Sequence, residues 1–270
     1  IEECSKCIQG YSYKNKKFLS KIKYLFLNKK KNDFIYYKKS LQNRRDIVIN
    51  NTENFFDHLV FPSQSFADYY FSHLVKKKSY SVISHGINIS NSFKKNNSSK
   101  KIKCIFTGGA DLKKGWQIVE EVFEKLLDNF QDKIQLRIYG DKKKTIKSKL
   151  KKFPSVEFFE RFKPNQIEKI MAWADIGIAP SYFETYSRIV REFVNFGVVP
   201  ISTNAFGVSE LINSNKNGII LDKPFSKNLF YIMSKIINEP SFLKSLQIGV
   251  KDSKIISKEE EFKRIFKLYN

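Results

Sequence analysis

Two glutamates, Glu184 and Glu192, stand eight residues apart in the segment PSYFETYSRIVREFV. The first comes just before a predicted helix over Ser187–Phe196, and the second lies inside that helix. Eight residues of helix rise about 12 Å, so the two carboxylates can contact opposite ends of one extended ligand. A nucleotide sugar has this layout, because its hydroxyl groups lie on both sides of a diphosphate and carboxylates accept hydrogen bonds from hydroxyls.

The predicted helix around Glu192 is apolar on nearly every side, where it carries Ile189, Val190, Phe193, Val194 and Phe196. Burying a glutamate among such side chains is costly unless a partner compensates its charge. Glu192 is therefore interpreted as functional. Glu184 stays open between a ligand contact and an ordinary carboxylate at a helix N-terminus. Arg188 opposes the helix dipole in the first turn, which favours an anion beside it, although the side chain could equally point into solvent.

A second group of candidates lies in the segment GGADLKKGW. Gly108 and Gly109 would allow main-chain N–H groups to approach a bulky anion closely. Lys114 and Gly115 stand at the start of the next predicted helix, where the dipole also favours anions. The spacing is not G-x-G-x-x-G, so the dinucleotide fingerprint is absent. Taken alone, a glycine pair after a strand more often marks a turn than a phosphate site.

Strands and helices alternate around these two loops. We expect strands at Ile102–Thr107, Ile134–Tyr139, Val156–Phe159, Ile176–Ala179, Val198–Ser202 and Gly218–Leu221. We expect helices between them at Gly115–Phe130, Thr145–Lys152, Asn165–Ala174, Ser187–Phe196 and Val208–Asn213. This alternation predicts an α/β fold with a doubly wound, mostly parallel sheet. With the strand order 3-2-1-4-5-6, a ligand binds between the first and fourth strands, where both candidate loops lie.

Five segments resemble retaining GT-B glycosyltransferases of family 4, the glycosyl transferases group 1, and they follow one another along the chain in the same order as in that family. The similarity runs from about Asp57 to Leu221. PSYFETYSRIVREFVNFGVVPIST resembles the Glu-x7-Glu signature of that family, and FTGGADLKKGW resembles its nucleotide loop. VEFFERFKPNQIEKIMAWADIGIAPS is similar to its segment ending in A-D-x-x-x-x-P-S, and AFGVSELINSNKNGIIL to its G-x-x-E-x-I stretch. DHLVFPSQSF and YSVISHGIN resemble the end of the acceptor domain and the crossover.

The resemblance implies transfer of a sugar from a nucleotide-diphosphate-sugar donor to a hydroxyl acceptor, a glycan or a lipid-linked saccharide, with retention. It implies that Glu184 contacts the donor sugar, that Glu192 binds the ribose, and that Lys114 binds the diphosphate and stabilises the leaving group. The rest of the expected donor site consists of Gly108, Gly109, Thr185, Tyr186, Ser187, Arg188 and Val190. Neither a metal nor a cofactor is expected, since the nucleotide sugar is a substrate.

The chain departs from the family pattern at several positions. The family often has Gly where Ser187 stands, Arg where Gly108 or Gly109 stands, and Ala where Phe193 stands. We predict that Arg188 replaces the missing arginine at the diphosphate. The histidine of the family's acceptor domain is not matched by His58, His73 or His85, each of which is interpreted as a surface or packing residue. These departures keep open a degenerate, non-catalytic binding partner, and an epimerase or phosphorylase is a further alternative.

The organisation expected from these patterns has four parts. Residues 1–91 form a partial N-terminal Rossmann-like domain on the acceptor side, and residues 92–101 a polar linker. Residues 102–238 form a complete C-terminal nucleotide-sugar-binding domain, and residues 239–270 add helices, the last of which returns to the N-terminal domain. The chain begins with Ile1, so we expect an N-terminal truncation and an isolated chain that binds nucleotide without turnover. Beyond the alternating elements given above, we expect strands at His58–Pro62 and Tyr80–Ser84. We expect further helices at Phe18–Leu27, Phe34–Asn50, Ser226–Asn238, Ser241–Val250 and Lys258–Leu268.

The formal net charge is +22, yet only seven of the 49 basic residues are arginine. Proteins that bind nucleic acid specifically rely on the planar guanidinium group of arginine, which binds two acceptors at once. A basic charge made mostly of lysine, spread along the chain, therefore argues against a nucleic-acid partner. A solvated surface or attraction to an anionic membrane surface fits better. No apolar run reaches the length of a membrane helix, so we expect a cytoplasmic protein, either free or peripheral at the inner face of a membrane. Cys4, Cys7 and Cys104 do not form a disulfide framework, and a metal at the first two would need further ligands.

Overall fold

The computed structural model describes residues 29–74, 78–90, 100–140, 146–222, 224 and 226–269. The expected helix Phe18–Leu27, the pair Cys4 and Cys7, and most of the expected linker 92–101 lie outside the described residues. The chain divides into two compact units, one comprising Ile1–Leu59 and Tyr70–Tyr80, the other Val60–Tyr69 and Ser81–Asn270. The domain boundaries expected from the sequence stay predictions.

The first unit contains the long helix α3 (Lys29–Phe55), which includes the expected helix over residues 34–50 and extends beyond it. Strands β1 (His58–Phe61) and β2 (Ser79–Val82), which begin in this unit, form a two-stranded sheet. The hydroxyls of Thr52 and Tyr70 lie 2.7 Å apart, which ties the C-terminal part of α3 to the segment that leads into β2.

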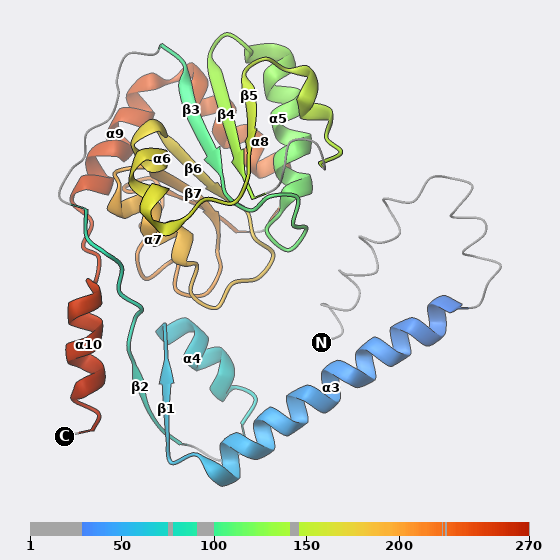
Figure 1. The fold of residues 1–270 in the computed structure, drawn as a ribbon, viewed down its shortest axis with the longest axis vertical. Coiled ribbons are helices and arrows are strands. Elements are labelled where there is room, and N and C mark those ends of the chain that lie inside the picture. Colours follow the sequence, from blue (N-terminus) through green and yellow to red (C-terminus); the bar gives the residue numbers. More distant parts are fainter. Residues whose placement is uncertain are drawn as a thin grey trace. The chain divides into compact units, whose positions relative to one another are not determined.

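The second unit is built on a six-stranded parallel sheet with the strand order β5-β4-β3-β6-β7-β8 (Figure 1). The strands are β3 (Ile102–Phe106), β4 (Ile134–Tyr139), β5 (Val156–Phe159), β6 (Ile176–Ala179), β7 (Val199–Thr203) and β8 (Ile219–Leu221). This is the expected doubly wound order 3-2-1-4-5-6. Phe106, the last residue of β3, pairs with Ile138 on one side and Ile178 on the other, so β4 and β6 diverge from β3 at the switch point.

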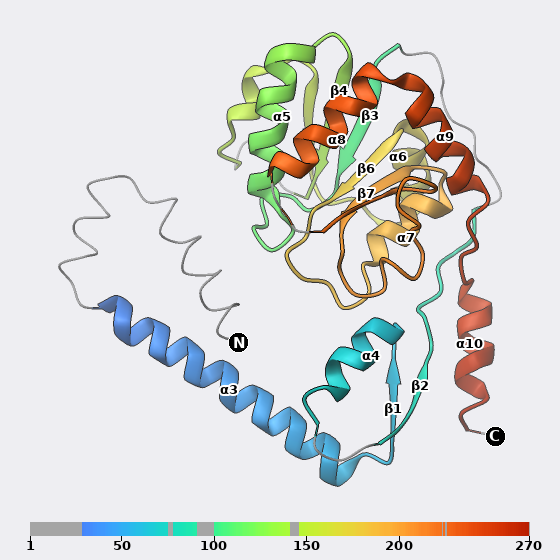
Figure 2. The same cartoon turned by 180° about the vertical axis from the view of Figure 1, so that it is seen from behind.

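Helices cover both faces of the sheet (Figures 1 and 2). Helices α5 (Trp116–Phe130), α8 (Ser226–Asn238) and α9 (Pro240–Lys251) lie on one face, and α6 (Ile167–Trp173) and α7 (Arg188–Asn195) on the other. Helix α5 buries Val119, Val122, Phe123 and Leu126, the spacing of one helical face. Every residue of β6 and β7 is buried, as expected for parallel strands covered on both faces, whereas buried residues alternate with more exposed ones in β4 and β5.

Helix α4 (Gln64–Phe71) begins in the second unit and ends in the first. The Ser63 hydroxyl accepts a hydrogen bond from Phe66 N at 3.3 Å, so Ser63 caps this helix. Helix α10 (Lys258–Phe266) is capped by Ser257, and residue 257 forms a parallel bridge with Ile87. Among the helices that the structure describes, none has the length and hydrophobicity needed to cross a membrane.

Two helix predictions were wrong. Residues 206–211, inside and beside the expected helix Val208–Asn213, form successive turns. Gly207 has φ 75, which breaks a right-handed helix at its start, and too few residues follow to nucleate another. The expected helix Thr145–Lys152 is reduced to a single 3-10 turn over Lys149–Lys152, where the Ser148 hydroxyl caps Leu150 N at 3.1 Å.

Candidate functional site

The loops after β3 and β6 touch one another at the switch point. Gly115, which has φ 81, approaches Pro180 so closely that a Cβ at this position would lie 2.2 Å from the Pro180 carbonyl oxygen. Tyr182 N donates a hydrogen bond to Lys113 O at 2.9 Å. The two candidate loops, about 70 residues apart in sequence, are therefore one structural unit.

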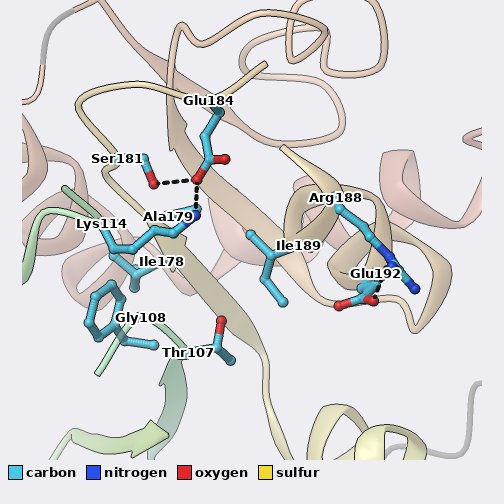
Figure 3. A pocket seen from close by; sticks show the side chains of 11 residues that line it. Thr107, Gly108, Lys114, Ile178, Ala179, Ser181, Glu184, Arg188, Ile189 and Glu192 are labelled. Atoms are coloured by element: carbon cyan, nitrogen blue, oxygen red, sulfur yellow. Dashed lines mark hydrogen bonds and ion pairs between the residues drawn. The ribbon is translucent and has the colours of Figure 1, made fainter. Parts of the chain in front are cut away.

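A cavity of about 340 Å³ opens between these loops and the start of helix α7 (Figure 3). It brings together five of the residues predicted for the site, namely Gly108, Lys114, Glu184, Arg188 and Glu192. The sequence reasoning did not single out the remaining lining residues, Phe106, Thr107, Ile178, Ala179, Ser181 and Ile189. Most of these follow or end a strand, so the rule that ligands bind at carboxyl ends of strands could have found them.

Lys114 and Glu184 form an ion pair across the cavity. The Lys114 Nζ lies 2.6 Å from Glu184 Oε1, and the Ser181 hydroxyl donates to the same oxygen at 3.0 Å (Figure 3). The Glu184 side chain is 17% exposed and that of Lys114 is 44% exposed. A ligand that takes either side chain must therefore compete with the other.

Glu192 projects from α7 into the cavity with 18% of its side chain exposed. Burial raises the pKa of the Glu192 carboxyl above its ordinary value, and the neighbouring Arg188 partly opposes this. Arg188 Nε lies 3.5 Å from Glu192 Oε1, and the arginine side chain is 66% exposed. Figure 3 shows Arg188 beside Glu192 and apart from Lys114, with Ile189 between them. The burial of Glu192 agrees with the expectation from its apolar helix.

Ser187 precedes α7 in the left-handed conformation, with φ 50 and ψ 64. Glycine adopts this conformation without strain, whereas a residue with a Cβ is disfavoured there by roughly 1 kcal/mol. The glycine that the family often has at this position is therefore explained by backbone geometry, and Ser187 adopts the same geometry at a cost.

Three other predicted donor-site residues have side chains outside this cavity. Tyr186 is buried, and its hydroxyl donates to His85 O at 2.8 Å. Thr185 presents its carbonyl to the Ser63 hydroxyl at 3.4 Å. Val190 is fully buried in the apolar core, and its N–H donates to Ser187 O at 3.1 Å. Contacts of these residues with a donor stay predictions, and such contacts must involve main-chain atoms or a rearranged loop.

The glycine pair is a turn held by the sheet. Gly109 has φ 57, and its N–H donates to Tyr139 O at 2.9 Å. This N–H is therefore engaged within the fold, and the expected approach of Gly109 to an anion stays a prediction. Gly108 lines the cavity, and a Cβ at this position would lie 2.4 Å from Phe106 Cζ and 2.7 Å from Lys114 Cβ. Gly108 thus permits the close packing of Lys114 against the end of β3.

An adjoining cavity of about 400 Å³ shares Thr107, Gly108 and Lys114 with the first. Its other walls come from the loop after β3 and from the ends of β4 and β5, and they consist of Ala110, Asp111, Tyr139, Gly140, Arg161 and Phe162. Sequence reasoning missed this extension, although its residues also follow parallel strands. The arginine of this cavity comes from the loop after β5 and not from the loop after β3.

His85 lies near the site without lining either cavity. Its Nδ1 is 2.9 Å from Glu261 Oε1 of α10, and its ring meets that of Tyr186 edge to face. The other oxygen of Glu261 accepts a hydrogen bond from Gly86 N at 2.9 Å. Within the part of the chain that the structure describes, no three His, Cys, Asp or Glu side chains gather as a metal site.

The doubly wound sheet, with a cavity of carboxylates and a lysine at its switch point, defines a Rossmann-like domain of the GT-B class. Residues 88–250, more than half of the chain, match the family Glycosyl transferases group 1. The chain belongs to this family. None of the curated proteins matches it in sequence.

Several solved structures share the fold. HepE from Anabaena, solved with UDP and glucose, has a TM-score of 0.66 and 15% identity, over 84% of this chain and 67% of that chain. Sucrose-phosphate synthase from Thermosynechococcus elongatus has a TM-score of 0.69 and 15% identity, over 84% of this chain and 61% of that chain. A variant of S. aureus TarM, solved with Fondaparinux, alpha-GlcNAc-glycerol and UDP, has a TM-score of 0.71 and 14% identity, over 83% of this chain and 46% of that chain. The chain thus spans about half to two thirds of the length of these structures.

Proposed function

We propose that this chain binds a nucleoside diphosphate sugar in the cavity at the switch point and serves a retaining transfer of the sugar to a hydroxyl acceptor. The observation that carries the proposal is the presence of a Lys114–Glu184 pair and a buried Glu192 on the walls of one cavity. The family match supports the reaction class. HepE solved with UDP-glucose supports the class of donor.

In this proposal Lys114 moves from Glu184 to the diphosphate when the donor enters. The bond between the anomeric carbon and the phosphate oxygen breaks, and its electron pair stays on the phosphate. The ammonium group stabilises the negative charge that develops there, in a site where a fixed cation is worth more than in water. The acceptor oxygen attacks from the same face, and its proton passes to the leaving phosphate.

The two carboxylates hold the ends of the donor. Glu184, released from Lys114, accepts hydrogen bonds from sugar hydroxyls. Glu192 accepts them from the ribose, and these charge-assisted bonds compensate the burial of its carboxylate. The acceptor, a glycan or a lipid-linked saccharide, belongs to the same proposal.

The left-handed Ser187 weakens the alternative of a degenerate binding partner. The serine in place of glycine was one reason to consider that alternative. Ser187 adopts a left-handed conformation that glycine adopts without strain, so the serine is compatible with a glycine-type turn at this position. A binding partner and a transferase differ in whether sugar is transferred once an acceptor is supplied.

Isothermal titration calorimetry tests the donor site. We expect the chain to bind one of UDP-glucose, GDP-mannose or ADP-glucose, and Glu192→Gln to weaken that binding by about tenfold through the loss of a charge-assisted bond. Glu259→Gln is the matched control, because Glu259 is 77% exposed on α10. The absence of binding by all three donors, or equal binding by Glu192→Gln, would contradict the proposal.

A further inference from the structure

Arg191 is a buried charge for which the proposed chemistry has no role. It lies on α7, next to Glu192 in sequence, and only 5% of the residue is exposed. Arginine is seldom buried to this extent unless its donors are paired. Its position on a helix that otherwise packs against the sheet therefore requires an explanation.

The guanidinium joins the loop after β6, which lines the donor cavity, to the loop after β7. Nη1 donates to Tyr186 O, and Nη2 donates to Gly207 O at 2.9 Å. The guanidinium carbon also lies 3.5 Å from the centre of the Tyr186 ring. Helical side chains lean toward the N-terminus of their helix, which is why a residue in the first turns of α7 reaches back to the loop before it.

The slot around this guanidinium is narrow. Gly207 has φ 75, and a Cβ at this position would lie 3.2 Å from Arg191 Nη2 and 3.3 Å from the Tyr186 ring. Burial lowers the pKa of Arg191 from its ordinary value, while Tyr186 and Glu210 oppose this shift. The charge is retained in a confined place where a shorter apolar residue would avoid the cost of desolvation.

The contacts of Arg191 fix the strained turn before α7. The left-handed Ser187 directly follows Tyr186, whose carbonyl and ring Arg191 holds. The Tyr186 hydroxyl is held separately by His85 O. A disfavoured backbone conformation persists only where its surroundings over-determine it, and these contacts supply that restraint.

We infer that Arg191 is a positioning residue of the donor site: it fixes the turn over residues 185–187, so that Glu184 before the turn and Glu192 after it face one cavity. This inference rests on the proposed function for the identity of the ligand. Independently of the ligand, the inference states that loss of the guanidinium makes the turn over residues 185–187 more mobile while the domain stays folded.

The test compares Arg191→Met with Asn195→Leu. Asn195 is a suitable control, because it lies one turn later on α7, is also 5% exposed and also bridges to main chain. Its Nδ2 donates to Asn88 O at 2.9 Å, and its Oδ1 accepts from Ser90 N at 3.1 Å. Both variants lose buried hydrogen bonds to main chain, so both should lower Tm.

Only Arg191→Met should weaken UDP binding, by about tenfold in calorimetry, since loss of a positioning contact misplaces both carboxylates. Arg191→Lys should bind with intermediate affinity, because an ammonium group cannot serve both carbonyls with the planar fork of arginine. UDP binding within twofold of the original protein in Arg191→Met, or an equal loss in Asn195→Leu, would overturn the inference.

Hydrogen exchange separates this inference from the proposed function. The Val190 amide, which donates to Ser187 O, should exchange about tenfold faster in Arg191→Met and at the original rate in Asn195→Leu. If the original protein binds no nucleotide, the proposed function fails while the exchange rates still decide the role of Arg191. Unchanged exchange at Val190 in Arg191→Met would disprove the positioning role.

Discussion

Lys114 and Glu184 are already paired before a ligand arrives, which makes them competitors for the donor. Free UDP must break the 2.6 Å pair and leaves Glu184 without a partner other than Ser181. A nucleotide sugar compensates Glu184 with hydroxyl groups. The pair should therefore favour sugar-bearing nucleotides over the free diphosphate.

We predict that Glu184→Gln binds UDP two- to fivefold more tightly than the original protein, because Lys114 is released, and binds UDP-glucose no better than UDP. Calorimetry with both ligands measures the difference. Lys114→Met is the companion variant and should weaken both ligands. Equal weakening of UDP and UDP-glucose in Glu184→Gln would show that the pair does not compete with the diphosphate.

The buried carboxylate of Glu192 should lower the free energy of unfolding of the domain, although it favours binding of the donor. Burial raises the pKa of the Glu192 carboxyl in the folded state above its value in the unfolded state. Between these two pKa values the native state binds more protons than the unfolded state, so the free energy of unfolding falls as pH rises. We predict that Glu192→Gln has a Tm a few degrees higher at pH 7 and that the difference disappears at pH 4. Thermal unfolding from pH 4 to 7 measures this. A Tm difference that grows toward low pH would contradict the sign.

At the scale of elements, the entry into α7 depends on a residue with positive φ. Ser187→Gly should relieve about 1 kcal/mol of strain but lose a similar amount through greater freedom of the unfolded chain, so we predict nearly unchanged stability and UDP binding. Ser187→Val should lose at least about 2 kcal/mol, because a branched side chain is poorly tolerated at φ 50. Urea unfolding distinguishes the two. Equal stability of the Gly and Val variants would exclude the left-handed turn.

The contact between the β3 and β6 loops depends on Gly115 in the same way. Gly115→Ala places a methyl group 2.2 Å from Pro180 O at φ 81, and we predict a loss of about 2 kcal/mol together with weaker UDP binding. Ala110→Gly is a control in the same loop, because it removes a Cβ instead of adding one. Urea unfolding and UDP titration of both variants measure the effect. Full stability in Gly115→Ala would mean that the loops separate without cost.

At the scale of the whole molecule, the net charge of +22 should govern weak association. We propose attraction to anionic membrane surfaces, where each well-placed lysine contributes about 1 kcal/mol. We predict binding to vesicles with 30% phosphatidylserine at 50 mM salt and release at 500 mM, since the Debye length falls with salt. Sedimentation with neutral vesicles is the control. Binding that ignores salt or lipid charge would point to another cause.

Several elements could be predicted from sequence to the residue. Strands β4, β5 and β6 have the expected bounds, because apolar residues at every position or at every second position between polar loops are a local signal of a strand. The turns over residues 206–211 could not be predicted as turns. Their apolar residues also fit one face of a helix, and only the packed structure shows the positive φ of Gly207.

Residue patterns were enough to predict the fold class, the switch point and three side chains that could act there, Lys114, Glu184 and Glu192. The alternation of strands and helices and a glutamate in an apolar helix are both local patterns, so they can be recognised in the sequence alone. The groups that these residues contact follow from the packing of the folded chain and could not be predicted. Lys114 pairs with Glu184 across about 70 residues, and Gly109 N is taken by Tyr139 O. The hydrogen bond from Arg191 to Gly207 O could not be predicted from the sequence either. Such contacts depend on how loops that are distant in sequence pack together, and no periodicity in the chain encodes that packing.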